Sequence, residues 1–165
     1  MSRVKIEAFQ NVYNTMLFWV NHYLGRLSDD QLRQRVRPGG NHGVWILGHL
    51  IASDDDLSMY LGRGPVLFPE YQEQFRRESP AESLDGYPDI ALLKQQWQAV
   101  CDKNAAIYSE LTDAELDAPH AMLNGPIEED YFKTKEGVLL NWIMHQQYHV
   151  GQLGLLVAGA KVEAE

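Results

Sequence analysis

Apolar residues recur at steps of three and four positions in four long segments of the chain. This spacing places them on one face of an α-helix. Gly25 and Gly62 follow two of the segments and Asn41 precedes one, which are residue types typical of helix ends. We therefore predict four long helices. They cover residues 3–24, from the N-cap Asn41 to Leu61, from Ile90 to Leu111, and from Val138 to Leu156.

The segments between these helices carry turn signals. Residues 62–88 contain GRGP, FPE, ESP and GYP and predict a long crossover connection with at most short helical pieces. LSDDQL (27–32) and LTDAEL (111–116) each place a Ser or Thr three residues before Gln or Glu, a capping box that starts a short helix. No alternating strand pattern of useful length occurs. We expect an all-α fold: one domain over residues 1–165, an antiparallel four-helix bundle with a long connection between its second and third helices.

Charge and composition exclude several classes of function. The 165 residues include 14 Lys and Arg against 23 Asp and Glu, a formal net charge of −9, which opposes nucleic-acid binding. No run of about 18 uncharged apolar residues predicts a membrane helix, and the N-terminus lacks the continuous apolar core of a signal peptide. The single Cys101 cannot form an internal disulfide. We expect a cytoplasmic protein with neither nucleic-acid nor membrane partners.

Two histidines in the fourth predicted helix have the spacing of metal ligands. His145 and His149 stand four residues apart in HQQYH, so their imidazoles project from one face about one turn apart. His49 lies in the apolar run VWILGHLIA of the second helix, where an ionisable side chain is costly without a partner. A metal ion shared by all three would supply that partner. The alternative interpretation is that these are hydrogen-bonded or partly exposed histidines without a metal.

The other histidines and the cysteine carry less chemical information. His22 lies near the end of the first helix, and we expect it at the surface or an interface. We expect His42 and His120 to be exposed. Cys101 lies on the apolar face of the third helix and is expected to be a small core residue. The acidic segment 125–130 is expected to be a solvated loop.

Two motifs together resemble one protein family. HQQYHVGQL, which begins at His145, resembles the final-helix signature H-x-x-x-H-x-G-Q of the DinB-like (DinB/YfiT-type) metalloprotein superfamily. The segment NHGVWILGHL, residues 41–50, resembles that family's W-x-L-G-H-L segment, with the histidine in place. The paired turns at 27–32 and 111–116 are also similar to the family's. The resemblance runs from the first helix to about Gly159.

The resemblance implies a four-helix bundle, usually dimeric, with one divalent metal ion held by His49, His145 and His149. Zinc or nickel is the first expectation for the metal, with iron, manganese or cobalt also compatible. Family members include thiol S-transferases that use low-molecular-weight thiols, so we expect a small-molecule substrate, a metal-dependent thiol transferase or hydrolase, and a homodimer. The alternative is a non-catalytic metal-binding or dimeric interaction protein.

Further residues are candidates for this site because of their positions on the predicted helix faces. Gln152 shares the face of the two helix-four histidines and would either orient an imidazole or make an ordinary bundle hydrogen bond. Asp56, two turns after His49, would be an acceptor or base near the site, although we favour a solvated carboxylate in the run 54–56. Asn141 and Tyr148 lie one turn from His145 on either side and are candidates to line a pocket. Trp45 and Trp142 would wall the pocket or pack in the core.

Overall fold

The structure, a computed structural model, describes residues 2–75, 84–122 and 132–162. Its described part contains helices and no strand. The predicted all-α class is therefore confirmed for these residues, and the acidic segment 125–130 lies outside them. The helices are α1 (Val4–Leu24), α2 (Asp29–Leu32), α3 (Gly43–Leu61), α4 (Tyr71–Gln74), α5 (Ile90–Glu110), α6 (Asp113–Leu116) and α7 (Lys135–Val162).

The four long helices α1, α3, α5 and α7 occupy the four segments predicted from apolar spacing. The α3 helix begins one residue later than expected, because His42 rather than Asn41 is its N-cap. The left-handed φ of 71° at Gly62 ends α3, a conformation that glycine adopts without steric cost. The short helix α2 begins with the predicted reciprocal capping box, in which Ser28 Oγ accepts from the Gln31 N–H (3.2 Å).

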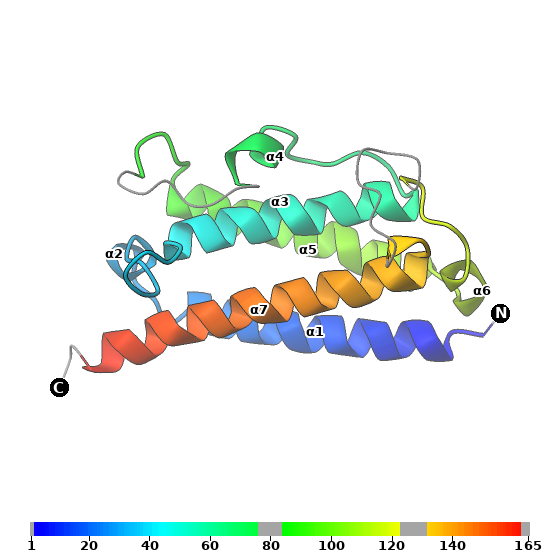
Figure 1. The fold of residues 1–165 in the computed structure, drawn as a ribbon, viewed down its shortest axis with the longest axis horizontal. Coiled ribbons are helices and arrows are strands. Elements are labelled where there is room, and N and C mark those ends of the chain that lie inside the picture. Colours follow the sequence, from blue (N-terminus) through cyan, green and yellow to red (C-terminus); the bar gives the residue numbers. More distant parts are fainter. Residues whose placement is uncertain (1, 76–83, 123–131, 163–165) are drawn as a thin grey trace.

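The long helices are not all antiparallel to their neighbours. Figure 1 shows α1 and α7 side by side and running in the same direction. Lys5 pairs with Glu136 near the start of both helices, and the Tyr23 ring lies against Gly154 near their ends. Helices α3 and α5 also run parallel (Figure 1). The expected antiparallel order is therefore wrong, because α5 begins at the same end of the bundle as α3 (Figure 1).

A buried polar cluster draws one side chain from each long helix. Asp54 of α3 is fully buried and accepts hydrogen bonds from the Gln146 amide of α7 and the Tyr13 hydroxyl of α1 (3.4 Å). The Asn104 amide of α5 donates to the Asp54 backbone carbonyl (2.9 Å). Burial raises the pKa of Asp54 to about 7, although the hydrogen bonds from Gln146 and Tyr13 favour the charged form and lower it.

The neighbouring carboxylate of Asp55 fastens the α3–α5 connection to α3. Its side chain is also fully buried and pairs with the Lys103 ammonium of α5. Its second oxygen accepts from the backbone N–H groups of Leu67 (2.7 Å) and Phe68 (2.8 Å). Asp56 is 8 % exposed. The expectation of a solvated carboxylate in the run 54–56 is therefore wrong: polar groups of other segments bind the carboxylates of Asp54 and Asp55, and Asp56 is buried.

Two of the histidines outside the predicted site also differ from expectation. His42 and His120 are both buried rather than exposed. His120 packs its ring on Tyr60 (centroids 5.3 Å apart) and accepts from the Met122 N–H (3.2 Å). Cys101 is buried in the core, as predicted, and burial raises its pKa. Within the described ranges, no helix has both the length and the apolar character that a membrane crossing requires.

Candidate metal centre

Three histidine side chains from α3 and α7 converge on one point. The Nε2 atom of His145 lies 2.9 Å from Nε2 of His49 and 3.1 Å from Nε2 of His149. The rings meet edge to face, with centroids 4.7 to 4.9 Å apart. His145 and His149 share a face because they are one turn apart, and α3 packs directly against α7. The fold thus brings together the three histidines that the sequence singled out.

A backbone carbonyl orients the His49 ring. Nδ1 of His49 lies 2.5 Å from the Phe75 carbonyl oxygen, which can only accept, so this nitrogen carries the hydrogen. Phe75 comes close enough because residue 48 is glycine: a Cβ there would lie 2.3 to 2.5 Å from three atoms of the Phe75 ring. Trp45 stacks on a face of the His49 ring, with centroids 4.6 Å apart and planes 9° from parallel. The His49 ring is held in a fixed orientation by these contacts.

A side-chain amide orients His149 in the same way. Nδ1 of His149 lies 2.8 Å from Oε1 of Gln152, three residues further along α7. With Oε1 as the acceptor, Nδ1 carries the hydrogen and Nε2 keeps its lone pair. Tyr148 places its ring 5.1 Å from that of His149, but the tyrosine is 64 % exposed and does not line the cavity described below.

Burial keeps the three imidazoles neutral at neutral pH. Burial first, and the neighbouring imidazoles second, lower the pKa of His145 to about 4 and that of His149 to about 3. Burial also lowers the pKa of His49, although the Phe75 carbonyl opposes this by favouring the charged form. Each ring therefore offers one nitrogen lone pair near pH 7.

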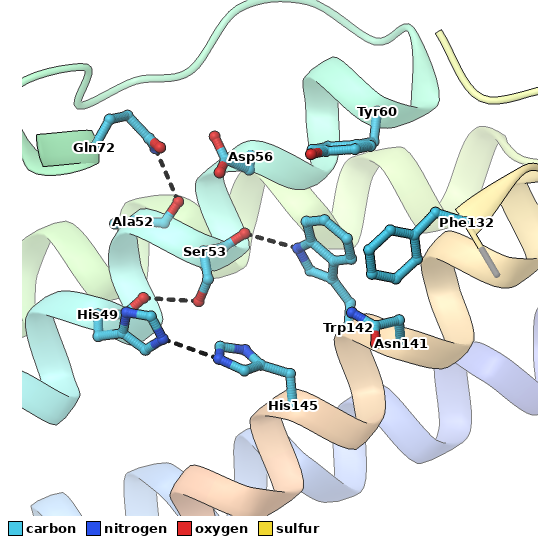
Figure 2. Close-up of a pocket in the computed structure, with 10 residues that line it drawn as sticks. All are labelled: His49, Ala52, Ser53, Asp56, Tyr60, Gln72, Phe132, Asn141, Trp142 and His145. Carbon is cyan, nitrogen blue, oxygen red and sulfur yellow. Dashed lines mark hydrogen bonds between the residues drawn. The ribbon is translucent and has the colours of Figure 1, made fainter. Parts of the chain in front are cut away.

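A cavity of about 200 Å³ opens beside His49 and His145, between α3 and α7 (Figure 2). Its aromatic lining residues are Tyr60, Phe132 and Trp142. Its polar lining residues are Ser53, Asp56, Gln72 and Asn141. The structure thus places Asp56, Asn141 and Trp142 in the cavity wall, while Gln152, Trp45 and Tyr148 lie against the histidine rings instead.

Comparison with known proteins gives one family. The sequence model of the DinB superfamily matches residues 19–153, which include α3 and the histidine pair of α7. The chain belongs to the DinB superfamily. No curated protein matches it. The resemblance seen in the two histidine motifs is therefore confirmed.

The donor set of this DinB-superfamily chain fits a metal ion. His49 and His149 both carry their hydrogen on Nδ1, so two Nε2 lone pairs face Nε2 of His145. A hydrogen on His145 Nε2 can point at only one of these two lone pairs, and the other contact is then left without a hydrogen bond. A cation among the three atoms removes this conflict. Tetrahedral Zn–N bonds of about 2.0–2.1 Å place ligand nitrogens about 3.3 Å apart, so the contacts of 2.9 and 3.1 Å need to lengthen only slightly.

Three residues at or beside the centre were not predicted from the sequence. Phe75 acts through its backbone carbonyl, 26 residues from His49, and no pattern of side chains in the sequence predicts such a contact. Gly48 could have been identified from the sequence, because a glycine inside a helix lowers stability and its presence there suggests close packing at that position. Ser53 was also missed as an acceptor; its backbone carbonyl binds the Trp142 indole N–H (2.7 Å).

Proposed function

We propose that His49, His145 and His149 bind one divalent metal ion through their Nε2 atoms, and that the chain is a metal-dependent enzyme on a DinB-type four-helix bundle. The observation that carries this proposal is the convergence of three neutral imidazoles whose other nitrogens, in two cases, are committed to acceptors. Imidazole ligands suit zinc and nickel first, and iron, manganese or cobalt next. Membership of the DinB superfamily supports the same assignment.

The chain's own residues supply the positioning. The Phe75 carbonyl and Gln152 Oε1 select the Nδ1–H tautomers of His49 and His149 and strengthen Nε2 as a donor. Trp45 covers one face of His49 and keeps water from it. When bound, the ion would act as a Lewis acid and lower the pKa of a thiol or water at the site. Three protein ligands leave room for such a molecule.

The neighbouring cavity supports an enzyme rather than a purely structural metal site. It reaches two of the three histidines and has space for a small molecule. We propose transfer of a low-molecular-weight thiol to an electrophile as the first reaction to assay, and hydrolysis as the second. Turnover in neither assay by protein with a full metal complement would favour the non-catalytic alternative.

Metal analysis tests the centre directly. Untagged protein is purified as the native chain, as His145→Ala and as His22→Ala, and metal per chain is measured by plasma mass spectrometry. His22 is an exposed histidine on α1 and serves as the matched control. We expect about one metal ion per chain in the native protein and the control, and a large loss in His145→Ala. Equal metal content in all three proteins would refute the assignment.

We also propose a homodimer formed through the outer face of α7. Four large apolar side chains on α7 are 50 to 71 % exposed and recur at helical spacing: Leu140, Met144, Tyr148 and Leu155. The sequence has no charged residue from Gly137 to Ala160, which is unusual for an exposed helix face. Sedimentation of Met144→Lys should show monomer where the native chain shows dimer, whereas Leu92→Lys, an exposed apolar position on α5, should leave the dimer intact.

A further inference from the structure

The cavity beside the histidine centre has the size of a single ring. At about 200 Å³ it exceeds the apolar cavity of about 150 Å³ that is known to hold benzene in another protein. It therefore has room for a six-membered ring and one small substituent. A longer substrate would have to extend out of the cavity.

Three aromatic side chains make this cavity suited to a ring. Trp142 has Tyr60 and Phe132 as neighbours, with centroids 4.8 Å and 6.1 Å away and interplanar angles of 57° and 64°. The indole N–H donates to the Ser53 carbonyl, which fixes the orientation of Trp142 (Figure 2). Aromatic rings favour further rings in tilted or edge-to-face arrangements of this kind.

One polar side chain of the cavity wall, that of Asn141, is available to bind a ligand. Asn141 is half-buried on α7, one turn before His145, and its amide makes no hydrogen bond within the described ranges. Other polar groups of the wall are engaged: Ser53 Oγ donates to the His49 carbonyl (2.7 Å), and Gln72 Nε2 donates to the Ala52 carbonyl (3.0 Å). The Asn141 amide thus offers a donor and an acceptor beside the histidine centre.

The charge of the wall favours an uncharged ligand over an anion. Asp56 supplies a carboxyl group, and neither Lys nor Arg occurs among the described residues that line the cavity. A carboxylate or phosphate on the ring would therefore find no cationic partner in this wall. A neutral group that both donates and accepts, such as a carboxamide, matches the Asn141 amide.

We propose that the cavity binds a neutral monocyclic aromatic group with a carboxamide-like substituent, and that Asn141 positions this substituent next to the histidine centre. The proposal rests on the proposed function, since it makes the ring part of the substrate of the same site. Asn141 acts as a specificity-determining residue: it selects a ring that carries a hydrogen-bonding substituent over one that carries none.

Benzamide and toluene are the probes for this proposal. Both carry one aromatic ring, but only benzamide can pair with an amide. Dissociation constants are measured by NMR titration of the full chain as native protein, Asn141→Ala, the bulkier Asn141→Leu, and Gln147→Ala, which removes an exposed amide from the same helix. We expect both Asn141 variants to weaken benzamide about three- to tenfold, the effect of one lost hydrogen bond, while the Gln147 variant changes nothing. Asn141→Ala should leave toluene binding unchanged.

The titrations are repeated on metal-free and zinc-loaded protein, so that failure of the metal site and failure of this proposal are distinguishable. Benzamide binding without metal, weakened by Asn141→Ala, supports the proposal whatever the metal content. Benzamide that binds only to zinc-loaded protein, that does not bind native protein, or that loses no affinity in a folded Asn141 variant overturns it. Circular dichroism confirms that each variant is folded.

Discussion

Gly48 and Phe75 are in contact so close that a side chain at position 48 would have to displace the Phe75 ring. A Cβ on Gly48 would lie 2.3 Å from one atom of the Phe75 ring, and Phe75 is fully buried. The same residue presents its carbonyl oxygen to Nδ1 of His49, the next residue in α3. The glycine therefore links the packing of the α3–α5 connection to the orientation of a proposed metal ligand.

Gly48→Ala should reduce both stability and metal affinity. The added methyl group must displace a buried ring, which costs about 1–3 kcal/mol of unfolding free energy. The displaced Phe75 carbonyl no longer orients His49, so zinc affinity should fall about 10- to 100-fold. Chemical denaturation and competitive zinc titration measure the two effects.

Gly154→Ala is the matched control for that substitution. It also adds a methyl group to a helix interior, but the nearest Tyr23 ring atoms lie at an ordinary contact distance of 3.4 Å. It should stabilise the protein by about 0.5–1 kcal/mol through helix propensity and leave zinc affinity unchanged. Equal effects of the two substitutions would contradict the role assigned to the Gly48–Phe75 contact.

Gln152→Ala should weaken metal binding without unfolding the protein. Removing Oε1 leaves Nδ1 of His149 without its acceptor, and we expect zinc affinity to fall about 10- to 100-fold. Gln152→Glu keeps an acceptor oxygen at the same reach and should retain most of the affinity. A Gln152→Ala protein that binds zinc as tightly as the native chain would show that the hydrogen bond does not orient a ligand.

Asp54 should contribute less to stability as the pH rises through the range in which only unfolded chains lose its proton. The carboxyl has an ordinary pKa of 3.8, and in the folded protein burial raises it to about 7. The folded state therefore holds more protons at Asp54 between these values, and the Asp54 contribution to the free energy of unfolding decreases with pH there. The buried His145 and His149 act in the opposite direction below pH 6.5, because their pKa values are lowered in the folded protein. The full loss is on the order of 4 kcal/mol. Above pH 7 this contribution is constant.

Asp54→Asn tests the pH dependence because it mimics the protonated carboxyl. It should unfold at higher denaturant concentration than the native chain at pH 8, and the difference in unfolding free energy between the two proteins should grow as the pH rises from 4 to 7. Asp102→Asn, at an exposed position on α5, should leave the profile unchanged. An Asp54→Asn profile that parallels the native one would assign the pH dependence to other groups.

Removal of the metal should lower thermal stability. A ligand that binds only the folded state at 100 times its dissociation constant stabilises it by about 2.7 kcal/mol, and a chelator abolishes this contribution. The thermal midpoint of native protein should therefore drop on chelation and recover with added zinc. His149→Ala should show neither change, whereas His22→Ala should show both.

Sequence periodicity was enough to locate the long helices and to nominate the three histidines. The apolar stripes predicted α1, α3, α5 and α7, because a helix must bury one face whatever it packs against. The turn motifs at Ser28 and Thr112 predicted α2 and α6, because a capping box is satisfied within four residues. The spacing of His145 and His149 placed both on one helix face for the same local reason.

Tertiary structure decided everything that depends on contacts between distant segments. The sequence does not show that α3 and α5 run parallel, or that Asp54 and Asp55 turn inward to polar groups of other helices, since each outcome depends on which elements meet. The hydrogen bond from His49 to the Phe75 carbonyl also depends on tertiary contacts, because every residue type has a backbone carbonyl and the sequence cannot show which one will be used. Local periodicity therefore determined the helices and the ligand candidates, while packing between distant segments determined their orientation and the cavity beside them.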